Sequence, residues 1–278
     1  MPASTIVVGK TQIIALLDTY MQFPWSVFLP DVDRSEIDAY KDLYPGSFGE
    51  PDAMFRTCAS AYVIRSEGKT IVCDTGVGPG PHAWLGGLTG NLLADMESKG
   101  VSPDEVDIVV FTHLHGDHVG WNLTTDGKPT FPRARYLAPQ ADWDLFLQNT
   151  QSNPQMQLVV PLEGMGLLEL VSGERTITSE VTTYPTPGHT PGHQSIMVTS
   201  AGERAIVTGD LAHFPAQVDR IEWCASFDMD KPTNTETRRK LFQQLETDGV
   251  ITAFCHFAEA PFGRLIRSDG KRIWQAIG

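Results

Sequence analysis

Three histidines and one aspartate lie within six consecutive residues of this chain. The run from residue 112 to residue 120 reads Thr-His-Leu-His-Gly-Asp-His-Val-Gly, and its titratable members are His113, His115, Asp117 and His118. Burying several such groups together is unfavourable unless they pair with one another or bind a metal ion. Imidazole and carboxylate groups are ligands of zinc. The spacing therefore predicts a metal site.

Three more polar residues occur in a similar local context. His189, Asp210 and His256 each follow a short run rich in β-branched residues, as expected at the end of a buried strand. Gly and Pro fix the turn around His189, and Gly209 precedes Asp210. If these strand ends meet the first cluster at one edge of the fold, seven ligands would surround two metal ions.

The order and context of these residues resemble the metallo-β-lactamase superfamily, with the complete ligands of its dinuclear hydrolases. The sequence Asp74-Thr75-Gly76, at the end of an early predicted strand, carries the same likeness. The matching motifs extend from Cys73 to His256. The resemblance implies an α/β fold, a four-layer αβ/βα sandwich in which two mixed sheets lie face to face with helices outside.

The resemblance also implies how the ligands are shared. The implied groups are His113, His115 and His189 on one metal ion, Asp117, His118 and His256 on the other, and Asp210 as the bridge. Asp74 is the candidate carboxylate that fixes the tautomer of a ligand histidine, and His193 is a candidate supporting hydrogen-bond partner. Two divalent ions are expected. Zinc is favoured, and iron, manganese or cobalt would also suit a mixed nitrogen and oxygen set.

For the reaction, the resemblance implies that a hydroxide bridging the metal ions opens a lactone or cleaves a related carboxylic ester. Asp117 and His213 are the candidate catalytic residues that carry the proton to the leaving alkoxide. The runs 186–193 and 209–213 resemble the branch that contains N-acyl-homoserine lactone lactonases and methyl parathion hydrolase. Many of these lactonases have a tyrosine three residues after the bridging aspartate. This chain has His213 at that position, and in this it resembles the organophosphate-hydrolysing relatives.

Two alternatives stay open beside this metal-dependent lactonase or esterase. The first is a hydrolase of organophosphate triesters, which would use the same hydroxide for in-line attack at phosphorus. The second is a metal-binding effector or regulatory member of the family with weak turnover. The presence of all seven ligands favours an enzyme.

Aromatic residues near the metal ligands are candidates for a substrate pocket, because ligand sites are mostly apolar with a few polar anchors. These candidates are Phe23, Trp25, Phe28, Phe214 and Trp223. For each of them a place in the core is an equal alternative. The isolated His82 is interpreted as structural.

The metal ligands need a scaffold, and the sequence predicts strands and helices in a single metallo-hydrolase domain, residues 1–278. Strands are predicted at 5–8, 12–17, 59–65, 70–73, 106–112, 134–137, 176–177, 181–183, 195–198, 205–208 and 250–255, and helices at 88–99, 140–148 and 235–245. Residues 20–56 are rich in Pro, aromatic and acidic residues without a clear period. We expect them to form a lid or a contact in a homodimer.

Composition narrows the classes of partner. The chain has 278 residues, enough for a substantial core, and a formal net charge of −13, which disfavours nucleic acids and acidic membranes. A small-molecule substrate is therefore expected. No apolar stretch is long enough to span a membrane, and the first residues do not resemble a signal peptide. The four cysteines form no Cys-x-x-Cys pair, so we expect reduced thiols in a cytoplasmic protein.

Overall fold

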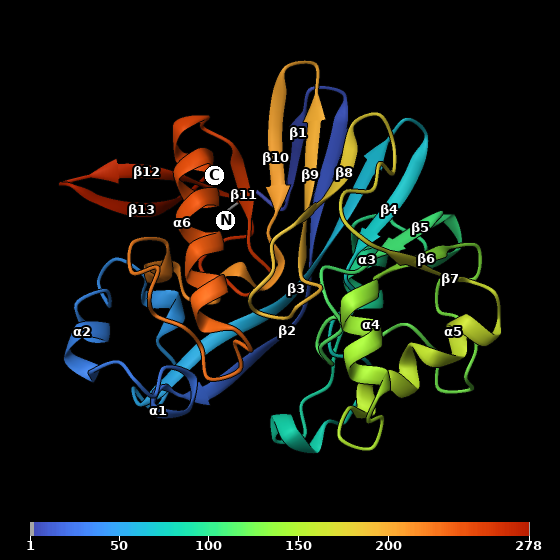
Figure 1. Cartoon of the computed structure of the whole chain (residues 1–278), viewed down its shortest axis with the longest axis horizontal. Helices are drawn as coiled ribbons and strands as arrows, with labels where there is room; N and C mark the ends of the chain where they lie inside the picture. The colour runs from blue at the N-terminus through green and yellow to red at the C-terminus, as the bar shows by residue number, and fades with distance from the viewer. Residues whose placement is uncertain (1–2, 278) are drawn as a thin grey trace.

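Two β-sheets lie face to face in the computed structural model, which describes residues 3–277 (Figure 1). The seven-stranded sheet contains, in spatial order, β1 (Thr5–Val8), β2 (Thr11–Pro24), β3 (Met54–Ser66), β4 (Lys69–Cys73), β5 (Ile108–Val110), β6 (Arg135–Pro139) and β7 (Leu168–Val171). The six-stranded sheet contains, in spatial order, β13 (Lys271–Ala276), β12 (Gly263–Ser268), β11 (Ile251–Ala253), β10 (Glu203–Val207), β9 (Gln194–Ser200) and β8 (Val181–Pro185).

The relative direction of neighbouring strands changes within each sheet. Strands β1 to β4 are antiparallel neighbours, whereas β4 to β7 are parallel. In the second sheet β10 and β11 are parallel, and the other neighbours are antiparallel. The carboxyl ends of parallel neighbours emerge at the same edge of a sheet. The loops that follow β4 and β5 therefore leave the first sheet at the same edge. The loops that follow β10 and β11 likewise leave the second sheet at the same edge.

Helices cover the outer faces of the sheets. The α-helices are α1 (Trp25–Phe28), α2 (Arg34–Asp38), α3 (Leu92–Ser98), α4 (Gln140–Leu147), α5 (Val160–Gly164) and α6 (Lys231–Thr247). The 3-10 helices are η1 (Pro45–Ser47), η2 (Ala83–Leu85), η3 (Pro103–Glu105), η4 (Pro154–Leu158), η5 (Gly209–Leu211) and η6 (Pro215–Val218). Apolar residues of α3, α4 and α5 pack on the seven-stranded sheet, and those of α6 pack on the six-stranded sheet. This arrangement is the predicted αβ/βα sandwich.

Alternating side chains explain why the first sheet is buried on both faces. In β2, Ile13 and Ala15 point into the core between the sheets, while Ile14 and Leu16 point to the core under the helices. Successive side chains of a strand point to opposite faces. A run that is apolar at every position is therefore the pattern of a strand covered on both sides.

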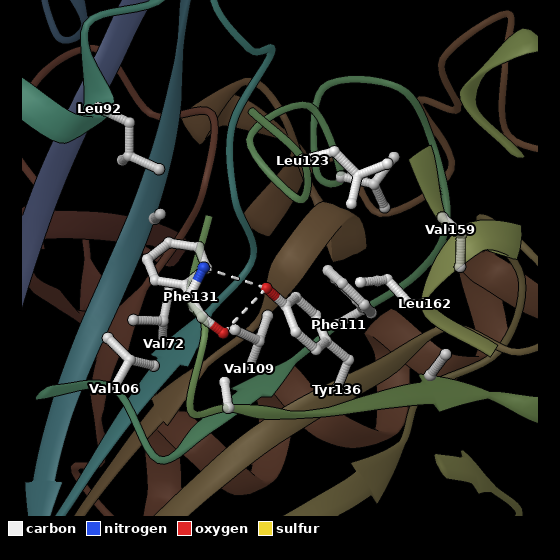
Figure 2. Close-up of a cluster of buried hydrophobic side chains, with 14 of the residues drawn as sticks. Val72, Leu92, Val106, Val109, Phe111, Leu123, Phe131, Tyr136, Val159 and Leu162 are labelled. Atoms are coloured by element: carbon white, nitrogen blue, oxygen red, sulfur yellow. Dashed lines mark hydrogen bonds between the residues drawn. The ribbon is translucent and has the colours of Figure 1, made fainter. Parts of the chain in front are cut away.

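The core under α3, α4 and α5 contains one internal polar anchor (Figure 2). The buried Tyr136 side chain lies beside Phe111, and its hydroxyl points at the backbone of Phe131. Its oxygen accepts a hydrogen bond from Phe131 N at 3.2 Å and lies 3.4 Å from Phe131 O. The turn that precedes β6 is thereby fixed to the core.

Several predicted elements are present with shifted ends. The strand predicted at 106–112 is the shorter β5. The helix predicted at 88–99 begins only at Leu92, because Leu88 O instead accepts a hydrogen bond from His82 N at 2.9 Å. The predicted strand at 176–177 is wrong, since Thr176 forms only an isolated bridge with Thr182.

The segment 20–56 is more regular than its composition predicts. Strand β2 continues to Pro24 and pairs with β3 as far as Met54. The remainder, with α1 and α2, is anchored by aromatic packing to the chain that follows β10 (Figure 1). This aromatic cluster includes Trp25, Phe28, Tyr40, Tyr44, Phe55, Phe214 and Trp223.

Two properties of the described residues bear on membrane and redox expectations. None of the helices within residues 3–277 is both long and apolar enough to cross a bilayer. The four cysteines are all buried with free thiols, and burial raises the pKa of the Cys58 thiol to about 12. A protonated, buried thiol is a poor nucleophile.

Candidate metal centre

The predicted ligands converge where loops from both sheets meet. Four of these loops follow β4, β5, β10 and β11, and the fifth is the turn between β8 and β9. Four overlapping groups of side chains with metal-ligand geometry lie there among the described residues. The predicted ligands make up two of them: His113, His115, His189 and Asp210 in the first, and Asp117, His118 and His256 in the second. The other two are Asp210 with His213 and His256, and Asp74 with His118 and Cys255.

In the first group, three imidazoles face one another. His115 Nδ1 lies 3.0 Å from His113 Nε2 and 2.9 Å from His189 Nε2. Asp210 Oδ2 lies 3.6 Å from His113 Nε2 and 3.3 Å from His189 Nε2. Bonds of about 2.0–2.1 Å to a tetrahedral zinc ion would place its ligand atoms roughly 3.3 Å apart. These four ligand atoms therefore fit a tetrahedral cation.

The second group lies on the other side of the Asp210 carboxylate. Asp210 Oδ1 is 3.1 Å from His118 Nε2 and 3.0 Å from His256 Nε2. Asp117 is more loosely placed, with its carboxylate oxygens 3.9 Å from His118 Nε2 and 3.6 Å from His256 Nε2. His256 Nε2 also lies 3.1 Å from Asp210 Oδ2. The Asp210 carboxylate therefore lies between the two groups, with Oδ2 facing His113 and His189 and Oδ1 facing His118, as expected of a bridging ligand.

Unpaired buried atoms provide a test of whether a metal fits. His118 Nε2 and Asp210 Oδ1 are buried and have no hydrogen-bond partner. Buried polar atoms are normally paired. Cations between these donors would supply the missing partners, and the residues therefore fit two divalent ions.

The ring orientations of the histidines support the same interpretation. Four Nδ1 atoms have oxygen acceptors, which place the proton on Nδ1 and leave the Nε2 lone pair facing the centre. These contacts are His113 to Thr112 Oγ1 at 3.0 Å, His118 to Asp74 Oδ2 at 2.8 Å, His189 to Asp228 Oδ1 at 2.8 Å and His256 to the Cys58 carbonyl at 2.6 Å. A neutral imidazole with an inward lone pair is the form that binds metal.

Burial and neighbouring charges set the titration of these rings. Burial lowers the pKa of His115 to about 3, and the His189 ring contributes in the same direction. Burial also opposes protonation of His118, but the carboxylates of Asp210 and Asp74 raise its pKa overall. The centre thus holds His115 neutral, whereas the carboxylates beside His118 favour positive charge at that position, where a cation would lie.

Asp74 occupies a conformation that few non-glycine residues adopt, with φ at +61°. Its carboxylate accepts hydrogen bonds from Thr112 N and Thr112 Oγ1, both at 2.8 Å, as well as from His118. The Thr112 hydroxyl in turn accepts from His113. Asp74 therefore connects the end of β4 to histidines of both groups, and backbone strain is commonly found at such functional positions.

His193 supports the turn that carries Asp210. Its Nδ1 donates to Thr186 O at 2.8 Å, and its Nε2 accepts from Asp210 N at 3.0 Å. The preceding Gly209 has φ at +60°, and a Cβ there would lie 2.7 Å from His193 Nε2 and from Thr112 Cβ. Only glycine lets the Asp210 turn approach the β5 loop this closely.

Sequence reasoning missed three buried polar residues behind the ligands. Asp142 on α4 accepts hydrogen bonds from Leu114 N at 3.1 Å and Gly192 N at 2.7 Å, so it joins the two histidine loops. Asp228 bonds His189 and lies 3.4 Å from Arg238, and both side chains are fully buried. No local motif indicates these residues, because their partners are distant in sequence.

A cavity of about 810 Å³ opens onto the centre. Asp117, Asp210, His115 and His256 form its floor. Its apolar walls include Met21, Phe23, Val27, Phe28, Phe55, Val77, Trp84, Leu158 and Phe227. The volume is in the range of small-molecule sites.

The cavity includes two of the five predicted pocket aromatics. Phe23 and Phe28 line it, whereas Trp25, Phe214 and Trp223 are absent from its wall and pack in the buried aromatic cluster. His82, interpreted as structural, lies on the cavity wall, where its Nε2 is 3.2 Å from Gly78 O.

His213 lines the cavity beside Asp210. Its Nε2 lies 3.1 Å from Asp210 Oδ2, and its ring stacks on that of His256 at 5.0 Å with an interplanar angle of 16°. Burial lowers the pKa of His213 to about 4, although Asp210 opposes this effect. The ring is therefore neutral at pH 7, and its Nε2–H donates to the Asp210 carboxylate.

The fold, the ligand arrangement and the sequence together define a class. Residues 59–256 match the family model described as the metallo-beta-lactamase superfamily, and the chain belongs to this family. Members of this superfamily are metal-dependent, and many are hydrolases that bind two zinc ions.

Similar proteins cover most of the chain. The uncharacterized protein YobT of Bacillus subtilis (strain 168) is 32% identical over 181 residues, covering 61% of this chain and 72% of YobT. An N-acyl homoserine lactonase of a Bacillus species is 25% identical over 199 residues, covering 64% of this chain and 74% of that enzyme.

Solved structures share the fold over nearly the full length. The hydrolase AbOPH superposes with a TM-score of 0.86 at 24% identity, covering 100% of this chain and 98% of AbOPH. AidC, a dizinc quorum-quenching lactonase in complex with the product N-hexnoyl-L-homoserine, gives 0.85 at 21% identity, with 99% and 97% covered. At these identities the likeness establishes the fold.

Proposed function

We propose that this protein is a dinuclear metal-dependent hydrolase that opens lactones or cleaves related carboxylic esters. The observation that carries the proposal is the Asp210 carboxylate, which lies between two groups of histidines at the floor of an apolar cavity. The similarity to N-acyl homoserine lactonases supports a lactone as the substrate.

The ligand residues would hold the two ions in fixed positions below the substrate. When bound, such ions supply a Lewis acid for the carbonyl oxygen and an activated water as the nucleophile. Asp210 spans the two sites, and the Nδ1 partners of the histidines keep their rings from rotating. The apolar walls orient the acyl group and exclude bulk water, so little reorganisation is needed during the reaction.

Asp117 is the residue that we propose moves the proton. Its side chain is 19% exposed at the cavity floor, whereas that of His213 is 3% exposed and already bonded to Asp210. Burial alone would raise the pKa of Asp117, but His118 and His256 lower it overall. The ionised carboxylate accepts the proton that the attacking water releases and delivers it to the leaving alkoxide.

In this mechanism His213 orients Asp210, the proposed bridging ligand. A neutral ring that donates to Asp210 Oδ2 holds the carboxylate in its bridging orientation. Histidine at this position is also the feature that keeps a neutral phosphotriester as the second candidate substrate, since the same nucleophile would attack phosphorus in line.

The experiment that tests the proposal combines metal analysis with a hydrolysis panel. The purified protein is loaded with zinc, manganese or cobalt and assayed on lactones of several chain lengths, aryl esters, a phosphotriester and a β-lactam. We expect about two ions per chain and turnover of the lactones or esters. Fewer than two ions, or no turnover of any class, would reject the enzyme and favour a binding or regulatory role.

A further inference from the structure

A buried ion pair lies directly behind one of the candidate metal ligands. Asp228 and Arg238 are both fully buried, and the Asp228 carboxylate lies between Arg238 and His189. The mechanism above gives neither residue a task. A buried ion pair is weak evidence for stability, because apolar residues of similar size often replace one without loss.

The Asp228 carboxylate is fully engaged. Its Oδ1 lies 2.8 Å from His189 Nδ1, and its Oδ2 accepts a hydrogen bond from Ala225 N at 2.8 Å. Arg238 Nη2 lies 3.4 Å from the same Oδ2. Because an ionised carboxylate only accepts, His189 Nδ1 carries the proton and its Nε2 lone pair faces the metal centre.

Arg238 extends this contact to the chain around Asp210. From α6 its Nε donates to Leu211 O at 2.5 Å, one residue after the bridge, and its Nη1 donates to Trp223 O at 2.8 Å. The single guanidinium therefore fixes both ends of the segment 211–223 and the carboxylate that orients His189. Few side chains other than arginine present several donors in this fixed fork.

We propose that Arg238 is a positioning residue that acts through Asp228 to fix the orientation of His189, and so sets the affinity for the metal ion held by His113, His115 and His189. The inference rests on the proposed dinuclear centre. Partners that lie one step behind metal ligands typically change metal affinity by about 10–100-fold.

The chain provides a matched control for a purely structural role. Arg272 on β13 is also buried, pairs with Glu246 at 2.7 Å and donates to Val218 O at 3.1 Å. Neither of these partners, Glu246 or Val218, is a candidate metal ligand. Arg272→Met should therefore reduce stability without changing metal affinity.

The test measures binding of zinc by chelator competition and the absorption spectrum of the cobalt-loaded protein, apart from any assay of activity. The variants are Asp228→Asn, Arg238→Met, Arg238→Lys and the double variant Asp228→Asn/Arg238→Met. We expect Asp228→Asn and Arg238→Met to weaken one of the two zinc sites by about 10–100-fold and to alter the cobalt bands. Arg238→Lys should restore part of the affinity.

The double variant decides whether Arg238 acts through Asp228. If Arg238 acts through Asp228, the double variant should bind zinc no more weakly than the single variant with the lower affinity. Both changes then interrupt the same contact to His189. Wild-type affinity and spectrum in folded Arg238→Met would overturn the inference, as would additive losses. If Arg238→Met does not fold, unchanged affinity in Arg238→Lys and Asp228→Asn overturns it. A wild-type protein that binds fewer than two ions refutes the proposed function instead.

Discussion

At the scale of single residues, Asp210 is the side chain whose chemistry the site depends on most. Asp210→Asn replaces one carboxylate oxygen with an N–H donor that would face an imidazole lone pair. We expect metal content to fall from about two ions to one or fewer, and kcat/KM to fall roughly 100-fold or more.

Metal analysis and steady-state rates measure both effects of Asp210→Asn. Asp107→Asn is the control, because Asp107 bonds Lys69 and Thr70 N away from the centre. Full metal content and rates in Asp210→Asn would exclude the bridging role.

The buried His193 predicts how the metal-free protein responds to acid. Burial lowers its pKa to about 3, with a further contribution from His189, whereas an unfolded histidine titrates near 6.5. As the pH falls from about 6.5 toward 3, the unfolded chain binds a proton that the folded chain does not. The free energy of unfolding should therefore fall, by up to about 1.4 kcal/mol per pH unit from this group.

Urea unfolding of the metal-free protein at several pH values between about 7 and 5 measures this dependence. The comparison is with His193→Gln, which lacks the titrating ring and should show a shallower loss of stability with acid. Equal slopes in the two proteins would mean that His193 titrates alike in the folded and unfolded states.

The histidines at 113–118 could be predicted because their spacing is local, and the family resemblance indicated Asp74 and His193 as supporting residues. The supporting residues Asp228 and Arg238 could not be predicted. His113, His115 and His118 share one loop, so the sequence itself brings them together. Asp228 contacts His189, and Arg238 contacts Asp228, only because α6 packs behind the turn that carries His189. The same limit applies to the pocket, since no sequence pattern distinguished Phe28, which lines the cavity, from Trp25 in the same helix.

At the scale of elements, β2 contributes a buried carboxylate that shapes one wall of the cavity. Asp18 lies where the β2–β3 register shifts, and it accepts hydrogen bonds from Val77 N at 2.6 Å, Asn91 N at 2.7 Å and Trp121 Nε1 at 3.0 Å. The segment 77–91 that it fixes at both ends carries His82 and Trp84 on the cavity wall.

Asp18→Asn should therefore change substrate binding more than catalysis. The amide turns a donor toward backbone N–H groups, which loses at least one hydrogen bond worth about 1 kcal/mol and loosens the segment 77–91. We expect KM to rise roughly fivefold, with kcat and metal content nearly unchanged.

Steady-state kinetics on the best substrate of the panel measure this split. Asp95→Asn is the matched control, because the Asp95 carboxylate bonds Leu17 N at 2.8 Å on the same strand and its other partner is Lys99, outside the segment 77–91. A fall in kcat at constant KM, or equal effects in the two variants, would argue against a role for Asp18 in the cavity wall.

The sequence predicted the elements that carry ligands better than those at the periphery. Strands β4, β5, β10 and β11 were found because each is an apolar run that ends in a chemically marked residue. The hairpin of β12 and β13 was missed, although Asp269-Gly270 between its strands is a known hairpin signal. Arg264 and Arg267 are three positions apart, so β12 lacks the regular alternation of apolar and polar residues that indicates a strand.

At the scale of the whole molecule, the segment 20–56 stays predicted as a lid or dimer contact. Its aromatic side chains pack in the buried cluster around Phe214, and this packing favours a fixed wall over a mobile lid. Size-exclusion chromatography at working concentration tests the dimer, and a monomer there would dismiss it.

The distribution of charge predicts which substrates the whole molecule rejects. Within residues 3–277, no lysine or arginine lines the cavity, and its only acidic residues are Asp117 and Asp210 at the floor. The chain also carries a net charge of −13. An anionic group at the outer end of a substrate would lose its hydration without gaining a cationic side-chain partner, and the overall field would slow its approach.

We therefore expect an ester or lactone with a carboxylate at its distal end to have a kcat/KM about 100-fold below that of its neutral methyl ester. Added salt should recover the part that comes from the overall field, while the desolvation part persists. Val27, which lines the cavity and is 53% exposed, offers a gain-of-function test. Val27→Lys should raise kcat/KM for the anionic substrate, and Val27→Met should not. If both substrates react equally in the wild-type protein, charge does not determine what this cavity accepts.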